Sequence, residues 1–215
     1  MLALQRQRLR AGDRRFGWKA GFGSPTALKS LGTDRPLVGF LTTNRVIEPG
    51  ATVSVTGWTK PLYEAEFAVH MARDVPPGAS ADDVRSAIGG VSAAVELVDV
   101  DHETTDVARI LAGNVFHRHV MIGPVDPTCR DLERVSVRVV LDDEEVDRTF
   151  DPEAMTGPLV DVVGSIADTL QRSGDGLAAG DVVITGSIFV PREVAAGQRL
   201  RAEFTGLGSL EVELT

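Results

Sequence analysis

The most informative stretch of the sequence is residues 61–69, Pro-Leu-Tyr-Glu-Ala-Glu-Phe-Ala-Val, taken together with residues 93–99, Ala-Ala-Val-Glu-Leu-Val-Asp. Both stretches are mostly β-branched, aromatic or aliphatic, which predicts two strands that run into a core. Side chains alternate along a strand, so Glu64 and Glu66 lie on one face, roughly 7 Å apart. Two carboxylates at that range repel by roughly 2–3 kcal/mol in an effective dielectric of about 20. Such a strand needs a compensating positive charge.

The second strand carries a lone carboxylate, Glu96, which makes a shared cation site attractive. Three carboxylates with no interleaved Cys or His suit Mg²⁺ or Mn²⁺ rather than structural zinc. They would leave about three octahedral positions for water and a chelating substrate. The alternative is a polar edge strand with Glu64 and Glu66 in water, and the alternation permits it, because Ala68 and His70 share their face.

Length and charge set bounds on the class of protein. With 215 residues we expect a single domain over 1–215 that buries a real core. A formal net charge of −9 argues against a nucleic-acid partner, which requires a basic footprint. The one cysteine, Cys129, excludes an internal disulfide and favours a cytoplasmic location. No apolar run approaches the length of about twenty residues that spans a bilayer, and residues 1–4 are too short for a signal-peptide core, so we expect no membrane partner.

Hydrophobic periodicity and turn residues predict a strand-rich chain with a few helices. Residues 1–15 read as a short helical N-terminal extension, and a Ser80/Asp83 capping box begins a helix that Gly89-Gly90 ends. The clearest helix begins at Pro158 and carries an apolar stripe. Further elements are expected as a short helix at 107–111 and strands at 16–22, 38–41, 52–55, 135–141, 145–150, 182–184, 199–204 and 210–214. One β-rich α/β (α+β) domain accounts for this order.

Several motifs, taken together and in order, resemble the 2-keto-4-pentenoate hydratase and 4-oxalocrotonate decarboxylase branch of the fumarylacetoacetate hydrolase superfamily. Each motif is weak alone, but their order along nearly the whole chain is specific. They are residues 17–22 (GWKAGF), 64–66 (EAE), 96–99 (ELVD), 113–114 (GN), 177–187 (LAAGDVVITGS) and 206–210 (GLGSL).

The resemblance implies a mixed β-sheet roll or sandwich with flanking helices. It implies that Glu64, Glu66 and Glu96 bind Mg²⁺ or Mn²⁺, that the substrate is a small 2-oxo acid, and that the chain forms a homo-oligomer. It also implies a role for Lys19 at the substrate. Independently, a cation beside a 2-oxo acid can hold its carboxylate or move a proton at the enol. Without the motif, Lys19 reads as a strand lysine that extends to solvent.

The segment 185–187 is expected at a strand end, where Gly186 lets backbone approach a ligand and the hydroxyls of Thr185 and Ser187 can donate. We predict Ser187, with Lys19, as catalytic, and Thr185, Gly186 and Asn114 as substrate contacts. The alternative for 185–187 is a plain turn. Cys129 reads as an inert thiol, and the four histidines lack zinc-finger spacing; of these, His117 and His119 are the nearest to a pocket because they follow Asn114.

The predicted activity is that of a metal-dependent lyase in aromatic-compound catabolism: hydration of 2-hydroxypenta-2,4-dienoate to 4-hydroxy-2-oxopentanoate. One departure bears on this prediction. Hydratases of the branch carry an aspartate where this chain has Leu37, which cannot move a proton. Three alternatives therefore stay open: decarboxylation of 2-oxohex-3-enedioate, hydrolysis of an acylpyruvate, and a non-catalytic metal-binding homologue.

Overall fold

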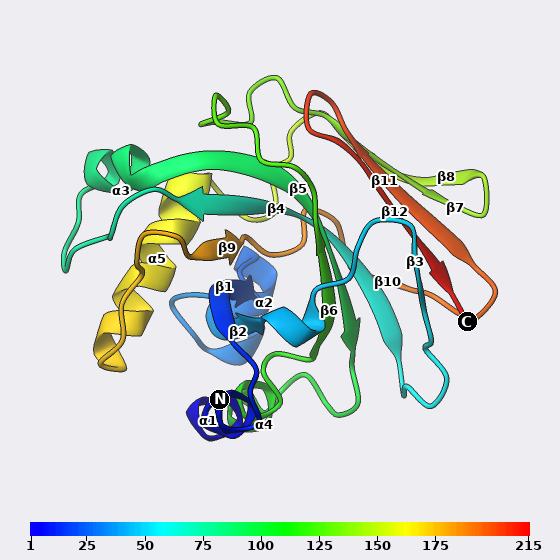
Figure 1. Cartoon of the computed structure of the whole chain (residues 1–215), viewed down its shortest axis with the longest axis horizontal. Helices are drawn as coiled ribbons and strands as arrows, with labels where there is room; N and C mark the ends of the chain where they lie inside the picture. Colours follow the sequence, from blue (N-terminus) through cyan, green and yellow to red (C-terminus); the bar gives the residue numbers. More distant parts are fainter.

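Two β-sheets carry the fold, as Figure 1 shows, in a computed structural model that describes residues 1–215 apart from the side chain of Leu2. The first sheet has the strand order β2-β1-β9-β4-β5-β6, with β10 added against β4. Its strands are β1 (Arg15–Gly21), β2 (Leu37–Thr42), β4 (Pro61–Met71), β5 (Ile88–Asp99), β6 (His117–Ile122), β9 (Val182–Ile184) and β10 (Arg192–Glu193).

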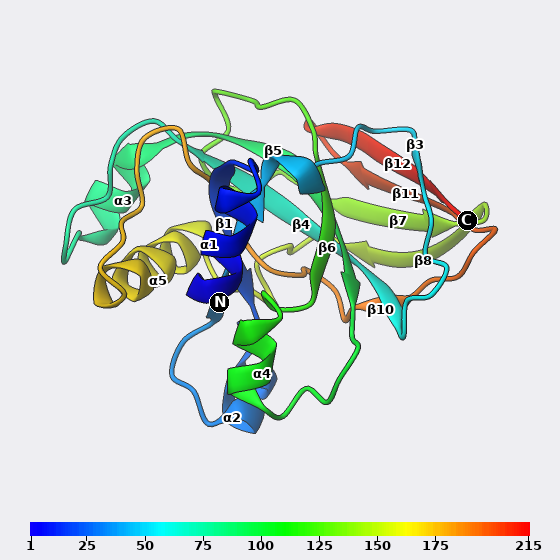
Figure 2. The same cartoon turned by 60° about the horizontal axis from the view of Figure 1, so that its bottom comes forward.

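The second sheet has the order β3-β12-β11-β7-β8. Its strands are β3 (Ala51–Val53), β7 (Val137–Leu141), β8 (Glu144–Thr149), β11 (Arg199–Phe204) and β12 (Gly208–Leu214). The helices are α1 (Leu2–Arg10), α2 (Pro25–Leu31), α3 (Ala81–Ala87), α4 (Val107–Ala112) and α5 (Leu159–Arg172), with a 3₁₀ turn at Thr43–Arg45. In Figure 2, α3 and α5 lie together at the end of the first sheet that is remote from the second sheet.

The main core lies on one face of the first sheet. The odd-numbered residues of β4 point into it, and the rings of Phe67 on β4 and Phe204 on β11 meet edge to face with centroids 5.4 Å apart. The apolar stripe of α5 covers the same face, as its periodicity predicted, with Leu159, Val162, Val163, Ile166 and Leu170 all buried. The stripe is therefore packing surface.

The first sheet curls, so its other face is also enclosed. Ala68 on β4 lies there in a small apolar cluster with Leu41, Ala94, Val120 and Ile184, all fully buried. The even-numbered residues of β4 share this concave face, which places Glu64 and Glu66 inside the curl. Since β4 is paired along its length with β5 and in part with β9 and β10, the polar-edge-strand alternative is wrong.

The strand-rich fold predicted from the sequence is confirmed, with local corrections. Gly89-Gly90 do not end the preceding helix in a loop, because β5 already begins at Ile88 and runs through both glycines. A Cβ on Gly90 would lie 2.6 Å from the carbonyl oxygen of Asp126, so the glycine permits a close approach of backbone. Helix α2 and strand β6 were not predicted. No helix among the described residues is long and apolar enough to cross a membrane.

Candidate metal centre

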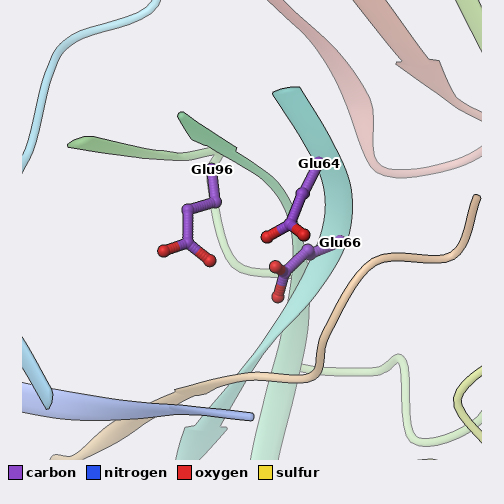
Figure 3. Close-up of side chains that lie close together, drawn as sticks. All are labelled: Glu64, Glu66 and Glu96. Carbon is purple, nitrogen blue, oxygen red and sulfur yellow. The ribbon is translucent and has the colours of Figure 1, made fainter. Parts of the chain in front are cut away.

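Three glutamates meet on the concave face of the first sheet. Strands β4 and β5 pair so that Glu64 lies directly opposite Glu96, and Glu66 follows on the same face of β4. One carboxylate oxygen of each residue lies within 4.8 Å of the others. Figure 3 shows the three carboxylates turned toward one another, two from β4 and one from β5. The sequence-predicted cage is thus assembled by the register of one strand pair.

Lys19 on β1 supplies the only lysine or arginine nitrogen that is bound to the cage among the described side chains. Its side chain is 1% exposed, and Nζ donates to Glu96 Oε1 and, at 3.0 Å, to the carbonyl oxygen of Val115. Opposite it on β2 stands Gly39, where a Cβ would lie 2.8 Å from Lys19 Cγ. The glycine therefore leaves room for the lysine stem to cross the curl.

The buried charges do not balance. Three carboxylates against one ammonium leave a formal −2, which a single divalent cation would neutralise. Without such a cation, burial and the neighbouring carboxylate of Glu96 raise the pKa of Glu64 to about 7. Burial and the other two glutamates also hold the pKa of Glu66 well above its ordinary value. Burial acts in the same direction on Glu96, but Lys19 and His117 overcome it and lower its pKa to about 2.

The oxygen lone pairs of the cage fit a hard divalent cation. Glu66 Oε1 and Glu96 Oε2 are both buried and have no hydrogen-bond partner among the described residues. The second oxygen of each of these two carboxylates is hydrogen-bonded. Gly186 N donates to Glu66 Oε2 at 2.7 Å, and Glu96 Oε1 accepts from Lys19. Each carboxylate is thus fixed by one oxygen and offers the other. Orphaned acceptors of this kind are costly unless a ligand uses them.

The contact from Gly186 arises where the chain leaves the end of β9. Thr185 N and Ile188 N still donate to β4, to the carbonyls of Phe67 and Ala65, but the two residues between bulge out of the ladder. Gly186 has φ +90°, which a side chain would disfavour. Its freed N–H turns to Glu66. The role of Gly186 as a substrate contact stays a prediction, since its amide N–H is directed at Glu66.

A strained turn positions the carbonyl that holds Lys19. Asn114, Val115 and Phe116 have φ values of +60°, +54° and +62° in succession, and each such residue costs about 1–2 kcal/mol. Asn114 stabilises the turn: its Oδ1 accepts from Phe40 N at 2.8 Å, and its Nδ2 donates to Phe40 O at 2.9 Å. Both amide atoms are thereby used on β2. Contact of Asn114 with substrate stays a prediction.

His117 completes the surroundings of Glu96. Its ring is fully buried, and Nδ1 lies 2.7 Å from Glu96 Oε1. Because an ionised carboxylate only accepts, Nδ1 carries the proton and the ring is neutral; burial keeps its pKa low. The sequence placed His117 near a pocket but did not assign it to Glu96. That pairing depends on a register shift between β5 and β6 at Leu97/Val98, which no local pattern reveals.

The cage opens into a cavity of about 270 Å³. Lys19, Glu64 and Ser187 line one part of it, and apolar side chains such as Val98, Val115 and Phe116 line much of the rest. Ser187 Oγ donates to the carbonyl of Phe189 at 2.7 Å, so its lone pairs remain available. The structure thus brings Lys19, Ser187 and the three glutamates to one site.

Thr185 and Leu37, which the sequence analysis singled out, do not line this cavity. Thr185 is buried with an unpartnered hydroxyl and is not part of the cavity wall. Leu37 is nearly buried in an apolar cluster with Val98, Val115 and Phe116, behind the cavity wall rather than in it. Both the catalytic role of Ser187 and the substrate role of Thr185 remain predictions. Cys129 lies far along the chain in a half-buried loop, and burial raises the pKa of its thiol, as an inert cysteine requires.

Metal binding should become more stabilising as the pH rises. Since the pKa of Glu64 is raised from 4.5 to about 7 in the metal-free fold, that fold loses stability between those values as the carboxyl ionises. A cation binds the ionised form and removes the penalty. We therefore expect the increase in Tm caused by Mn²⁺ to grow from about pH 5 to about pH 7.5. Thermal unfolding with Mn²⁺ and with a chelator measures it, and an increase independent of pH contradicts the assignment.

His117 should govern metal affinity through the orientation of Glu96. Loss of a partner that holds a ligating side chain typically costs about 10–100-fold in affinity. We expect that weakening for His117→Leu, whereas His117→Asn, which keeps an N–H near the position of Nδ1, should retain most of the affinity. Calorimetric titration with Mn²⁺ gives the dissociation constants. Equal affinities for the leucine variant and the parent protein would show that His117 does not position Glu96.

Sequence relatives carry two activities. The chain is 28% identical over 211 residues to a 4-oxalocrotonate decarboxylase of Pseudomonas putida, covering 96% of this chain and 80% of that protein. It is 30% identical over 208 residues to a 2-keto-4-pentenoate hydratase of Burkholderia vietnamiensis, covering 95% of this chain and 79% of the relative. The two similarities are of equal strength and do not choose between hydration and decarboxylation.

Among solved structures, the fold matches a 4-oxalocrotonate decarboxylase from Pseudomonas putida G7, complexed with magnesium and adipate. The TM-score is 0.91 at 26% identity, over 99% of this chain and 82% of that one. A fumarylpyruvate hydrolase from Pseudomonas aeruginosa, in complex with Mn²⁺ and pyruvate, shares the fold with a TM-score of 0.71 at 18% identity. The family model for the fumarylacetoacetate (FAA) hydrolase C-terminal domain matches residues 23–215, and the chain therefore belongs to the FAA hydrolase family.

Proposed function

We propose that this protein is a divalent-metal-dependent lyase that hydrates 2-hydroxypenta-2,4-dienoate to 4-hydroxy-2-oxopentanoate. The observation that carries the proposal is the buried cage of Glu64, Glu66 and Glu96, with a formal charge of −2 after Lys19 is counted, at the base of a cavity of about 270 Å³. Mg²⁺ or Mn²⁺ is the proposed ion, because the site offers only carboxylate oxygens. Both named relatives act on related unsaturated 2-oxo acids.

The three glutamates would hold the ion, and Lys19 would hold the substrate. When bound, the ion supplies Lewis-acid polarisation of the 2-oxo group of a chelating acid. Burial would lower the pKa of Lys19, but the three glutamates overcome it and raise the pKa, so the ammonium stays charged. It therefore acts as a fixed cation that binds the carboxylate or the enol oxygen and not as a free base.

Hydration requires a proton to move from the enol oxygen to C5, after which water adds across C3 and C4. Ser187 would hold that water as a hydrogen-bond acceptor, because its own hydrogen is donated to Phe189 O and its lone pairs are free. The apolar walls formed by Val98, Val115 and Phe116 keep other water away from the enol. Since Leu37 lies outside the cavity wall, the protons must travel through other groups that line it.

Decarboxylation of 2-oxohex-3-enedioate is the second candidate. It needs the same stabilised dienolate, and the structural match to the Pseudomonas putida G7 decarboxylase favours it. The metal cage serves either reaction. The two reactions differ in their substrates: 2-oxohex-3-enedioate carries a second carboxylate, which 2-hydroxypenta-2,4-dienoate lacks.

Turnover tests the proposal directly. Protein loaded with Mg²⁺ or Mn²⁺ should remove the diene absorbance of 2-hydroxypenta-2,4-dienoate, and Glu66→Gln should lower kcat/KM at least about 100-fold by removing a ligand. Glu213→Gln, an exposed position on β12, is the matched control and should behave as the parent. The Tm of metal-free Glu66→Gln should not fall, because the substitution relieves repulsion. CO₂ release from 2-oxohex-3-enedioate without diene loss would assign the decarboxylase, and cleavage of acylpyruvates alone would assign the hydrolase.

A further inference from the structure

A second cavity of about 610 Å³ adjoins the one above the metal cage. Six residues line both cavities and so mark the junction between them; they are Phe22, Ser24, Ala27, Thr104, Met155 and Pro191. Lys19 and Glu64 line only the first cavity and so are not part of the junction. A ligand whose carboxylate end sits at the cage therefore points its far end toward the second cavity.

The walls of this far end are uncharged. In the first cavity the only charged lining residues are Lys19 and Glu64, both at the cage. In the second cavity no Asp, Glu, Lys, Arg or His lines the wall among the described side chains. Val190, which is 72% exposed, continues this uncharged wall to the rim of the second cavity.

Helix α2 offers little to replace a cation. Its first residue is Pro25, which has no N–H, and Ala27 N already donates to the capping hydroxyl of Ser24 at 3.3 Å. The hydroxyls of Ser24 and Thr104 can form single hydrogen bonds to a ligand but do not neutralise a charge. A carboxylate placed at the junction would lose part of its hydration and find no charged partner among the described side chains, which is unfavourable.

We infer that the site accepts 2-hydroxy-2,4-dienoates with an uncharged hydrocarbon substituent on C5, and prefers them to those that end in a second carboxylate. The inference rests on the proposed function and sharpens it. The hydrocarbon occupies the second cavity, against Met155 and Val190, while the enol acid occupies the first. The same pocket chemistry disfavours the dicarboxylic substrate of a decarboxylase.

Binding of saturated 2-oxo acids to the Mg²⁺-loaded protein tests this selectivity without relying on turnover. Each added methylene in an apolar pocket changes selectivity by about tenfold or more. By calorimetry, 2-oxooctanoate should bind at least about tenfold more tightly than 2-oxopentanoate, and 2-oxohexanedioate at least about tenfold more weakly. The matching dienoates should show the same order in kcat/KM.

A pair of variants at the junction provides the control. Met155→Lys adds a cation where the far end of the ligand lies, and it should reverse the order so that 2-oxohexanedioate binds more tightly than 2-oxooctanoate. Met155→Leu keeps an apolar wall and should keep the parent order. Parent protein that binds 2-oxohexanedioate as tightly as 2-oxooctanoate would overturn the inference while leaving the lyase assignment intact. Failure of all three acids to bind would instead overturn the proposed function, and this inference with it.

Discussion

The enclosure of three carboxylates and one ammonium within the curl of the first sheet is the constraint on which the site depends. Burial of an uncompensated charge strongly lowers the free energy of unfolding. Here Lys19 compensates one carboxylate, Glu96, and leaves Glu64 and Glu66 to share protons in the metal-free fold, as their raised pKa values indicate. A site that is unfavourable when empty and balanced with a divalent cation is built for that cation. Its affinity is linked to the stability of the whole domain.

Two irregular backbone segments lie next to the three glutamates and Lys19, and each directs one backbone group at the site. The bulge after β9 frees the N–H of Gly186 for Glu66, and the left-handed turn at 114–116 points the carbonyl of Val115 at Lys19. Two hydrogen bonds between the side-chain amide of Asn114 and the backbone of Phe40 stabilise this strained turn. The long, regular pairing of β4 with β5 is the rigid frame that makes these local departures tolerable.

Strand alternation is a local property, so the sequence predicts that Glu64 and Glu66 share a face wherever the strand lies. The position of Glu96 opposite Glu64 depends on the register of β4 and β5, and the sequence suggested it only through a lone carboxylate in a second apolar strand and through the family resemblance. The sequence also predicts the Ser80/Asp83 capping box, which the structure contains. The pairing of His117 with Glu96 is out of reach, since it depends on the register between two strands. The turn at 114–116 also cannot be predicted from the sequence. Val115 and Phe116 are residue types that avoid positive φ, and they adopt it here because tertiary contacts stabilise the turn. Helix α2 had a readable signal, Ser24 followed by Pro25 and closed by Gly32, which sequence reasoning overlooked.

The position of a bound cation tests most directly whether the three glutamates form a metal centre. Crystals soaked in Mn²⁺ and measured at the manganese absorption edge give that position by anomalous scattering. We expect one strong peak between Glu64, Glu66 and Glu96, with Lys19 still bonded to Glu96. A peak elsewhere, or no peak at the cage in crystals that diffract well, would contradict the assignment of a metal centre.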